Sequence, residues 1–147
     1  MSKPASELST IFGPTGALAK RIDGFRHRAS QIEMAEKIEA AIDRAGVLIA
    51  EAGTGTGKTF AYLVPALRSG GKVIISTGTK TLQDQLFHRD SPTVIAALGI
   101  PVSTALLKGR ANYVCLHHLE EAVADGRFMN REDVKHIAVI TGLRSVR

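Results

Sequence analysis

The stretch Glu51-Ala52-Gly53-Thr54-Gly55-Thr56-Gly57-Lys58-Thr59 decides the fold. It lies between a short apolar run, Val47 to Ala50, and a helical pattern that extends from Lys58 to about Arg68. Glycines in such a turn let successive backbone N–H groups point inward around a polyphosphate, and the N-terminus of the following helix adds positive potential. The spacing therefore predicts a phosphate-binding loop between a buried strand and a helix.

Each residue of this loop has a predicted role. The backbone that would enclose the phosphates consists of Ala52, Gly53, Thr54, Gly55, Thr56 and Gly57. Lys58 would reach the β and γ phosphates of ATP, and the Thr59 hydroxyl would ligate Mg²⁺, so these two residues are the catalytic candidates. A dinucleotide-binding turn is disfavoured, because Lys58 stands where its third glycine would be. Ala52 replaces the first glycine of the strict pattern, which is typical of the helicase form of the loop.

Apolar runs and helical patterns alternate along the chain and predict an α/β fold. Buried parallel strands are expected at 47–50, 72–76 and 102–107. The expected helices are 17–22, 30–46 with a Ser30/Glu33 capping box, 58–68, 81–88, 93–98, 112–124 capped by Asn112, and 130–141. Strand, helix and strand in this order form a βαβ unit, so the helices should flank a parallel sheet.

Composition limits the class of protein. The chain has 147 residues, of which 44% are apolar and 22% charged, as expected for an ordinary soluble domain. A net charge of +5 favours a polyanionic partner such as nucleic acid. One cysteine excludes an internal disulfide framework. No apolar run approaches the roughly 20 residues of a membrane span, and no secretory signal is recognised, so we expect no membrane partner and a cytoplasmic location.

Three further segments, together with the loop, resemble one helicase family. They are Phe25-Arg26-His27-Arg28-Ala29-Ser30-Gln31, Ser76-Thr77-Gly78-Thr79-Lys80-Thr81-Leu82-Gln83-Asp84-Gln85-Leu86 and Lys108-Gly109-Arg110-Ala111-Asn112-Tyr113-Val114-Cys115. From about Phe12 onward the chain is similar to superfamily 2 helicases of the XPD/DinG family, and to their bacterial DinG and YoaA branch. The resemblance implies a RecA-like P-loop NTPase fold.

The resemblance also implies roles for residues outside the loop. Gln31, with Arg28, would read the adenine of ATP, because an amide offers a donor and an acceptor side by side. Thr77, Thr79 and Gln83 would contact the DNA backbone. Cys115 would be the first of four cysteine ligands of a [4Fe–4S] cluster, of which this chain has only one.

Each of these residues also has a plainer structural interpretation. Gln31 would then be an exposed residue in the first turn of a helix, and the threonines would belong to a turn that caps a helix. Cys115 would be a half-buried thiol packed beside Leu119. His117 and His118 are expected to be surface residues on different faces of a helix.

The intact relative would use ATP hydrolysis to unwind DNA from 5′ to 3′ at single-stranded or forked sites in repair and replication, near the nucleoid. Hydrolysis needs an apolar strand ending in Asp-Glu, and the sequence has none. We therefore expect an N-terminal fragment that is hydrolytically inactive alone. Its expected parts are a partly loop-like segment at 1–27, a partial RecA-like ATP-binding domain at 28–107, and the truncated start of an iron–sulfur insertion at 108–147.

Two other functions remain open at this point. A standalone phosphotransferase of the nucleotide-kinase type could be built on the same loop, and phosphate transfer to nucleosides or nucleotides would identify it. A non-catalytic module that binds nucleotide or single-stranded DNA is the other alternative, and it predicts salt-sensitive DNA binding.

Overall fold

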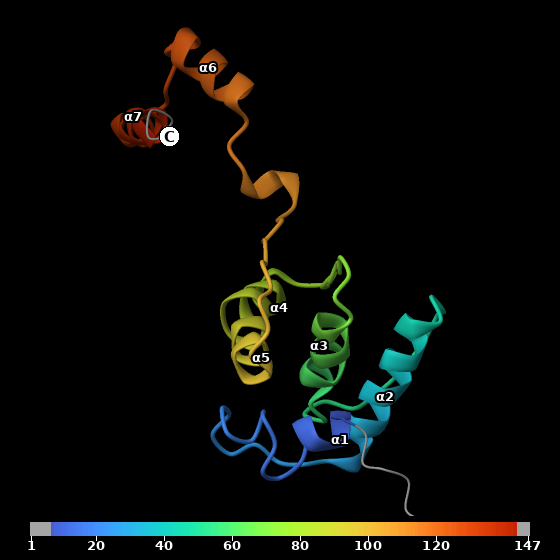
Figure 1. The fold of residues 1–147 in the computed structure, drawn as a ribbon. Helices are drawn as coiled ribbons and strands as arrows, with labels where there is room; N and C mark the ends of the chain where they lie inside the picture. Colours follow the sequence, from blue (N-terminus) through green and yellow to red (C-terminus); the bar gives the residue numbers. More distant parts are fainter. Residues whose placement is uncertain (1–6, 144–147) are drawn as a thin grey trace, which may run out of the picture. The chain divides into compact units, whose positions relative to one another are not determined.

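The structure, a computed structural model, describes residues 7–143. These residues form two compact units divided between Leu106 and Leu107. Each unit is helical where it has regular structure (Figure 1). The first unit holds the phosphate-loop sequence, and the second holds Cys115.

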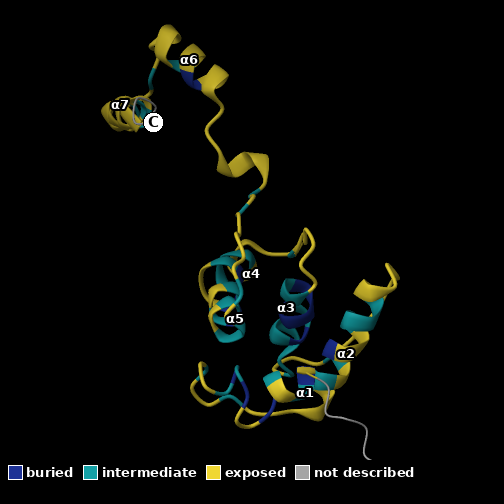
Figure 2. Ribbon diagram, in the orientation of Figure 1, coloured by how far each residue is buried: buried dark blue, intermediate teal, exposed yellow. Residues whose placement is uncertain are grey.

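The first unit is organised around one central helix. Its elements are α1 (Glu7–Ile11), α2 (Ala29–Asp43), α3 (Lys58–Arg68), α4 (Lys80–Gln85), the π-helical segment η1 (Leu86–Asp90) and α5 (Ser91–Leu98). Helix α3 packs against both α2 and α5, and Figure 2 shows it in the colours of buried and half-buried residues. The core consists of Leu8, Phe12, Leu18, Ala35, Ala61, Leu63, Val64, Leu86 and Val94. Three of these residues, Ala61, Leu63 and Val64, lie on α3, and their burial stabilises the position of the helix that follows the loop.

The predicted helix 58–68 is confirmed as α3, and the helix predicted from Ser30 is confirmed as α2 with a different start. The prediction of a capping box between Ser30 and Glu33 is wrong. Arg28 is the N-cap residue, and it makes no side-chain capping bond. Glu33 instead accepts a hydrogen bond from Lys37 Nζ at 2.7 Å, one helical turn further along, because its carboxylate points along the helix surface rather than back to the first turn.

Other helix predictions differ from the structure in their limits. The short helix expected at 17–22 is wrong, because this segment forms turns, while α1 precedes it. The two helices expected at 81–88 and 93–98 form one continuous helical run from Lys80 to Leu98 through η1. Asp90 is buried there and accepts hydrogen bonds from Gln85 Nε2 at 2.8 Å and Arg89 Nε at 2.9 Å. These bonds satisfy the carboxylate where the helix was expected to be interrupted.

The three predicted strands are not seen within residues 7–143. The segments 47–50, 72–76 and 102–107 have no regular secondary structure, and no sheet is present in this part of the chain. Val47, Ile49 and Ile74 are more than nine-tenths exposed instead of buried. A strand needs neighbouring strands for its backbone N–H and C=O groups and for its apolar faces, and these segments have none among the described residues.

The second unit contains η2 (Arg110–Asn112), α6 (Leu116–Asp125) and α7 (Arg131–Leu143). The predicted cap at Asn112 is wrong, since α6 begins after Cys115. The helix expected at 130–141 is confirmed as α7. Asn130 Oδ1 accepts hydrogen bonds from the backbone N–H groups of Glu132 and Asp133 at 2.9 and 2.8 Å, which satisfies the first turn of α7. None of the helices in residues 7–143 has the length and apolar character to span a membrane.

Candidate nucleotide-binding site

The phosphate-loop sequence forms a turn that leads directly into α3. Gly55 and Gly57 have φ angles of +73° and +82°, in the left-handed region that favours glycine. The Thr56 hydroxyl donates to the Gly53 carbonyl at 2.9 Å and closes the turn from inside. Gly57 is the N-cap residue of α3. The loop backbone therefore ends at the N-terminus of an eleven-residue helix, where unpaired N–H groups favour an anion.

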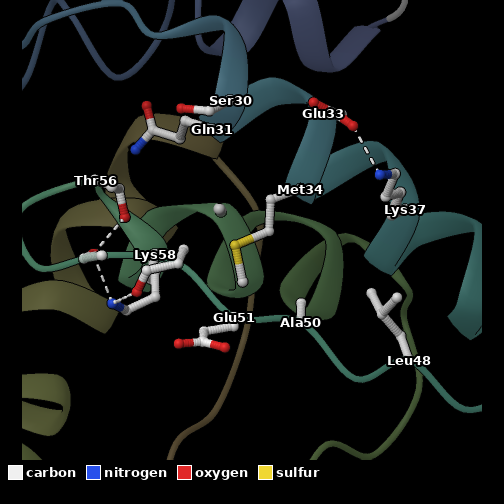
Figure 3. Close-up of a pocket in the computed structure, with 13 residues that line it drawn as sticks. Ser30, Gln31, Glu33, Met34, Lys37, Leu48, Ala50, Glu51, Thr56 and Lys58 are labelled. Atoms are coloured by element: carbon white, nitrogen blue, oxygen red, sulfur yellow. Dashed lines mark hydrogen bonds and ion pairs between the residues drawn. The ribbon is translucent and has the colours of Figure 1, made fainter.

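Lys58 folds back over this loop. Its ammonium group donates to the Ala52 carbonyl and, at 2.7 Å, to the Gly53 carbonyl. Figure 3 shows the Lys58 side chain beside Thr56 at one end of the pocket. These two carbonyl contacts place a positive charge at the mouth of the loop, where a polyphosphate can replace the carbonyls as the acceptor.

Thr59 lies in the first turn of α3, next to Lys58. Tyr62 lies one turn further along the same helix. Burial raises the pKa of Tyr62, the Thr59 hydrogen bond lowers it, and the nearby Asp90 carboxylate raises it. Thr59 thus carries a hydroxyl in the first turn of α3, and a hydroxyl at the loop end of this helix fits the preference of Mg²⁺ for oxygen ligands.

Gln31 and Arg28 reach the loop from the start of α2. Gln31 is 4% exposed, and its Nε2 donates to the Gly57 carbonyl at 2.9 Å. Its Oε1 is buried and has no hydrogen-bond partner in the part of the chain that the structure describes. Arg28 Nη1 donates to the Gly55 carbonyl. The interpretation of Gln31 as an exposed surface residue is wrong, because the loop covers it.

A pocket of about 340 Å³ lies beside the loop and α2 (Figure 3). The lining residues are Ser30, Gln31, Glu33, Met34, Lys37, Leu48, Ala50, Glu51, Ala52, Gly53, Thr56, Lys58 and Ala61. Met34, Leu48 and Ala50 supply an apolar surface next to the polar loop. The sequence placed Met34 in the motif of Gln31, one turn after that residue, but assigned no site role to Leu48 or to Ala50, which directly precedes the loop.

The residues predicted to touch DNA lie outside this pocket. The Thr79 hydroxyl accepts a hydrogen bond from the Leu82 N–H at 3.2 Å and caps α4. The Thr77 hydroxyl donates to the Thr79 carbonyl at 3.1 Å, and Gln83 lies in α4. The capping interpretation is therefore confirmed for Thr79. Its hydroxyl proton is still available to a phosphate oxygen, since the cap uses only the oxygen.

Cys115 is exposed at the N-cap position of α6. The half-buried packing expected for its thiol is wrong. A [4Fe–4S] cluster needs four ligands of this type, and the chain contains one cysteine. The residues present do not fit a complete cluster, so none can be assembled by this chain alone.

His117 and His118 are surface residues, as expected, with 74% and 77% of their side chains exposed. Their expected separation onto different faces is wrong, because both contact one carboxylate. His117 Nε2 lies 3.5 Å from one oxygen of Glu121, and His118 Nδ1 lies 3.0 Å from the other. Residues three and four positions before the same glutamate both reach it, since each lies about one helical turn away.

Comparisons with known proteins agree with the resemblance seen in the sequence. The profile of the family described as "DEAD/DEAH box helicase" matches residues 29–143. The chain is 54% identical to "ATP-dependent DNA helicase YoaA" of Haemophilus influenzae over 82% of its length, and 56% identical to "ATP-dependent DNA helicase YoaA" of Escherichia coli over 78%. It is 42% identical to "ATP-dependent helicase DinG" of Mycobacterium tuberculosis over 73%.

The chain spans only 19%, 18% and 17% of these three relatives, respectively. No solved structure matches it. The family profile covers more than half of the chain, from the start of α2 to the end of α7. The chain belongs to the DEAD/DEAH box helicase family, and the relatives it matches include YoaA and DinG helicases.

Proposed function

We propose that this chain is the ATP-binding part of an ATP-dependent DNA helicase. The observation that carries the proposal is the contact between Gln31 and Gly57, which joins a buried amide to the phosphate loop. ATP would place its phosphates on the loop, with Lys58 and Thr59 holding the phosphates and Mg²⁺. Its base would then lie toward Gln31 and the apolar wall of the pocket. Family membership favours this activity over a nucleotide kinase.

The unpartnered Gln31 oxygen supports adenine recognition in particular. A buried acceptor without a donor is costly, and the exocyclic amino group of adenine could supply the missing donor. Guanine has a carbonyl oxygen at that position, so it would face the Gln31 oxygen with an acceptor. Gln31 thus discriminates between the two bases through its unused hydrogen-bonding capacity.

We expect Gln31→Ala to remove most of the preference for ATP over GTP. The lost hydrogen bonds correspond to about 1–2 kcal/mol, or roughly tenfold in relative Kd. Competition of ATP and GTP against a fluorescent ATP analogue measures this preference. Gln83→Ala, which removes an amide from α4 outside the pocket, is the control and should retain the wild-type preference. An unchanged preference in Gln31→Ala would contradict adenine recognition by this residue.

For the whole protein we propose 5′ to 3′ unwinding of DNA, with single-stranded or forked DNA as the partner that it binds, in repair and replication in the cytoplasm near the nucleoid. The names of the YoaA relatives and the net charge of +5 support DNA as the substrate. We also propose that the segments 47–50, 72–76 and 102–107, which have no regular secondary structure here, become parallel strands in a complete RecA-like domain. Their apolar side chains, such as Ile49 and Ile74, support this because they lack cover among residues 7–143.

Cys115 is proposed as one ligand of a [4Fe–4S] cluster in a protein that supplies the other three. Its exposed thiol at the start of α6 supports this role. The proposed parts of the chain stay as expected from the sequence: residues 1–27 before the nucleotide-binding region, 28–107 as the partial ATP-binding domain, and 108–147 as the start of the cluster region.

DNA binding by Thr77, Thr79 and Gln83 gives a separate prediction. Gln83→Ala should weaken single-stranded DNA binding several-fold, because one backbone contact contributes about 1 kcal/mol, and should leave ATP binding unchanged. Wild-type affinity should fall with added salt, with a log–log slope of about −0.7 for each neutralised phosphate. Fluorescence anisotropy of a labelled oligonucleotide measures both effects. Gln31→Ala is the reciprocal control. Salt-independent affinity, or equal affinity in the Gln83 variant, would count against this surface.

A further inference from the structure

Two histidines and a glutamate converge on the surface of α6, in the unit that does not contain the phosphate loop. The metal-ligating atoms of His117, His118 and Glu121 all lie within 4.8 Å of one another. One oxygen of Glu121 faces His117 Nε2 at 3.5 Å, and the other faces His118 Nδ1 at 3.0 Å. Both imidazoles thus lie beside the same carboxylate.

We propose that His117, His118 and Glu121 form a binding site for a divalent transition-metal ion such as Zn²⁺, Co²⁺ or Ni²⁺. Neutral imidazole nitrogens and a carboxylate oxygen are ligands that these ions prefer. Three protein ligands leave further coordination positions for water, as in an open site. All three side chains are at least 60% exposed, so an ion can reach them directly from solvent.

Binding requires the three side chains to move closer together. Two ligand atoms at about 2.1 Å from the same tetrahedral ion lie about 3.4 Å apart. The present limit of 4.8 Å among the three atoms exceeds this value by about 1.4 Å. Exposed side chains can make such a shift by rotating about their own bonds, with the backbone of α6 unchanged.

The ligand types also predict which ions bind poorly. Mg²⁺ and Ca²⁺ are hard cations that take oxygen ligands, and this cluster offers one carboxylate. The α6 site should therefore be distinct in selectivity from the proposed Mg²⁺ position at Thr59. It is also distinct from the proposed cluster ligand Cys115, because the three residues include no thiolate.

Titration calorimetry of the purified, tag-free chain with ZnCl₂, CoCl₂ and MgCl₂ tests the proposal. We expect one Zn²⁺ or Co²⁺ ion per chain and no Mg²⁺ binding in the absence of nucleotide. His118→Gln and Glu121→Gln should each weaken Zn²⁺ binding by at least about tenfold, because loss of even an outer-shell partner of a ligand commonly costs about 10- to 100-fold in affinity. The Co²⁺ complex should also lose visible absorption in these variants.

Matched controls come from α7 of the same unit. His136→Gln and Glu132→Gln change one exposed histidine and one exposed glutamate outside the cluster, and both should bind Zn²⁺ as the wild type does. Cys115→Ser should also retain Zn²⁺ binding. Circular dichroism establishes that each variant keeps its helices. Absence of Zn²⁺ binding by the wild type, loss of binding only in Cys115→Ser, or unchanged affinity in the folded His118 and Glu121 variants would overturn the proposal.

Discussion

Lys58→Ala is expected to weaken ATP binding by about 3 kcal/mol, or roughly 100-fold in Kd. The Lys58 ammonium group now donates to the Ala52 and Gly53 carbonyls. On binding, it would exchange these neutral acceptors for charged phosphate oxygens, which form stronger hydrogen bonds. Removal of the ammonium group therefore destabilises the ATP-bound state more than the ATP-free state, and the free energy of binding becomes less favourable. Titration calorimetry with Mg·ATP measures the difference.

Lys72→Ala is the control for the effect of the chain's net charge on ATP affinity. It removes the same positive charge from an exposed position that does not line the pocket, so affinity should change by less than about twofold through long-range electrostatics in moderate salt. Equal losses in the two variants would mean that ATP responds to net charge and not to a contact with Lys58.

Gly57→Ala is expected to have the second large effect. A Cβ atom at Gly57 would overlap the Gln31 amide nitrogen. The φ angle of +82° adds about 1–2 kcal/mol of backbone strain for a residue other than glycine. The variant should therefore lose both the loop conformation and the Gln31 contact, and its ATP affinity should fall by at least about tenfold. The same calorimetric titration measures this loss.

Two other glycines separate the causes of this effect. Gly55 also has a positive φ, of +73°, but a Cβ there would meet nothing within 4 Å. Gly55→Ala should thus introduce backbone strain alone, and its loss of ATP affinity should be smaller than that of Gly57→Ala. Gly78→Ala has open space and no positive φ, so ATP affinity should be unchanged. If Gly55→Ala and Gly57→Ala lose affinity equally, the Gln31 contact contributes nothing to binding.

The sequence predicted the loop and α3 well because their signals are local. Glycines at 55 and 57 and the apolar face of residues 58–68 act within a few positions of one another. The close approach of Gln31 to Gly57 joins residues 26 positions apart, and the resemblance suggested a shared site without giving this contact. The pocket wall at Leu48 was missed as part of the site because its apolar side chain was assigned to a sheet core.

The strand predictions were less successful for a physical reason. Apolar runs such as 47–50 and 72–76 show a preference for burial, but strand formation depends on partners that are distant in the sequence. The convergence of His117 and His118 on Glu121 was missed for a different reason. Adjacent helix positions differ in direction by about 100°, yet long side chains reach a common residue one turn away.

The central claim is that the loop backbone binds the phosphates of ATP. Nuclear magnetic resonance of the ¹⁵N-labelled chain tests it directly, by comparing amide shifts on addition of Mg·ATP and of adenosine. We predict large shifts for Gly53, Gly55, Gly57 and Lys58 with Mg·ATP and small shifts at these amides with adenosine. Shifts confined to residues outside 51–59, or no shifts with Mg·ATP, would contradict the account.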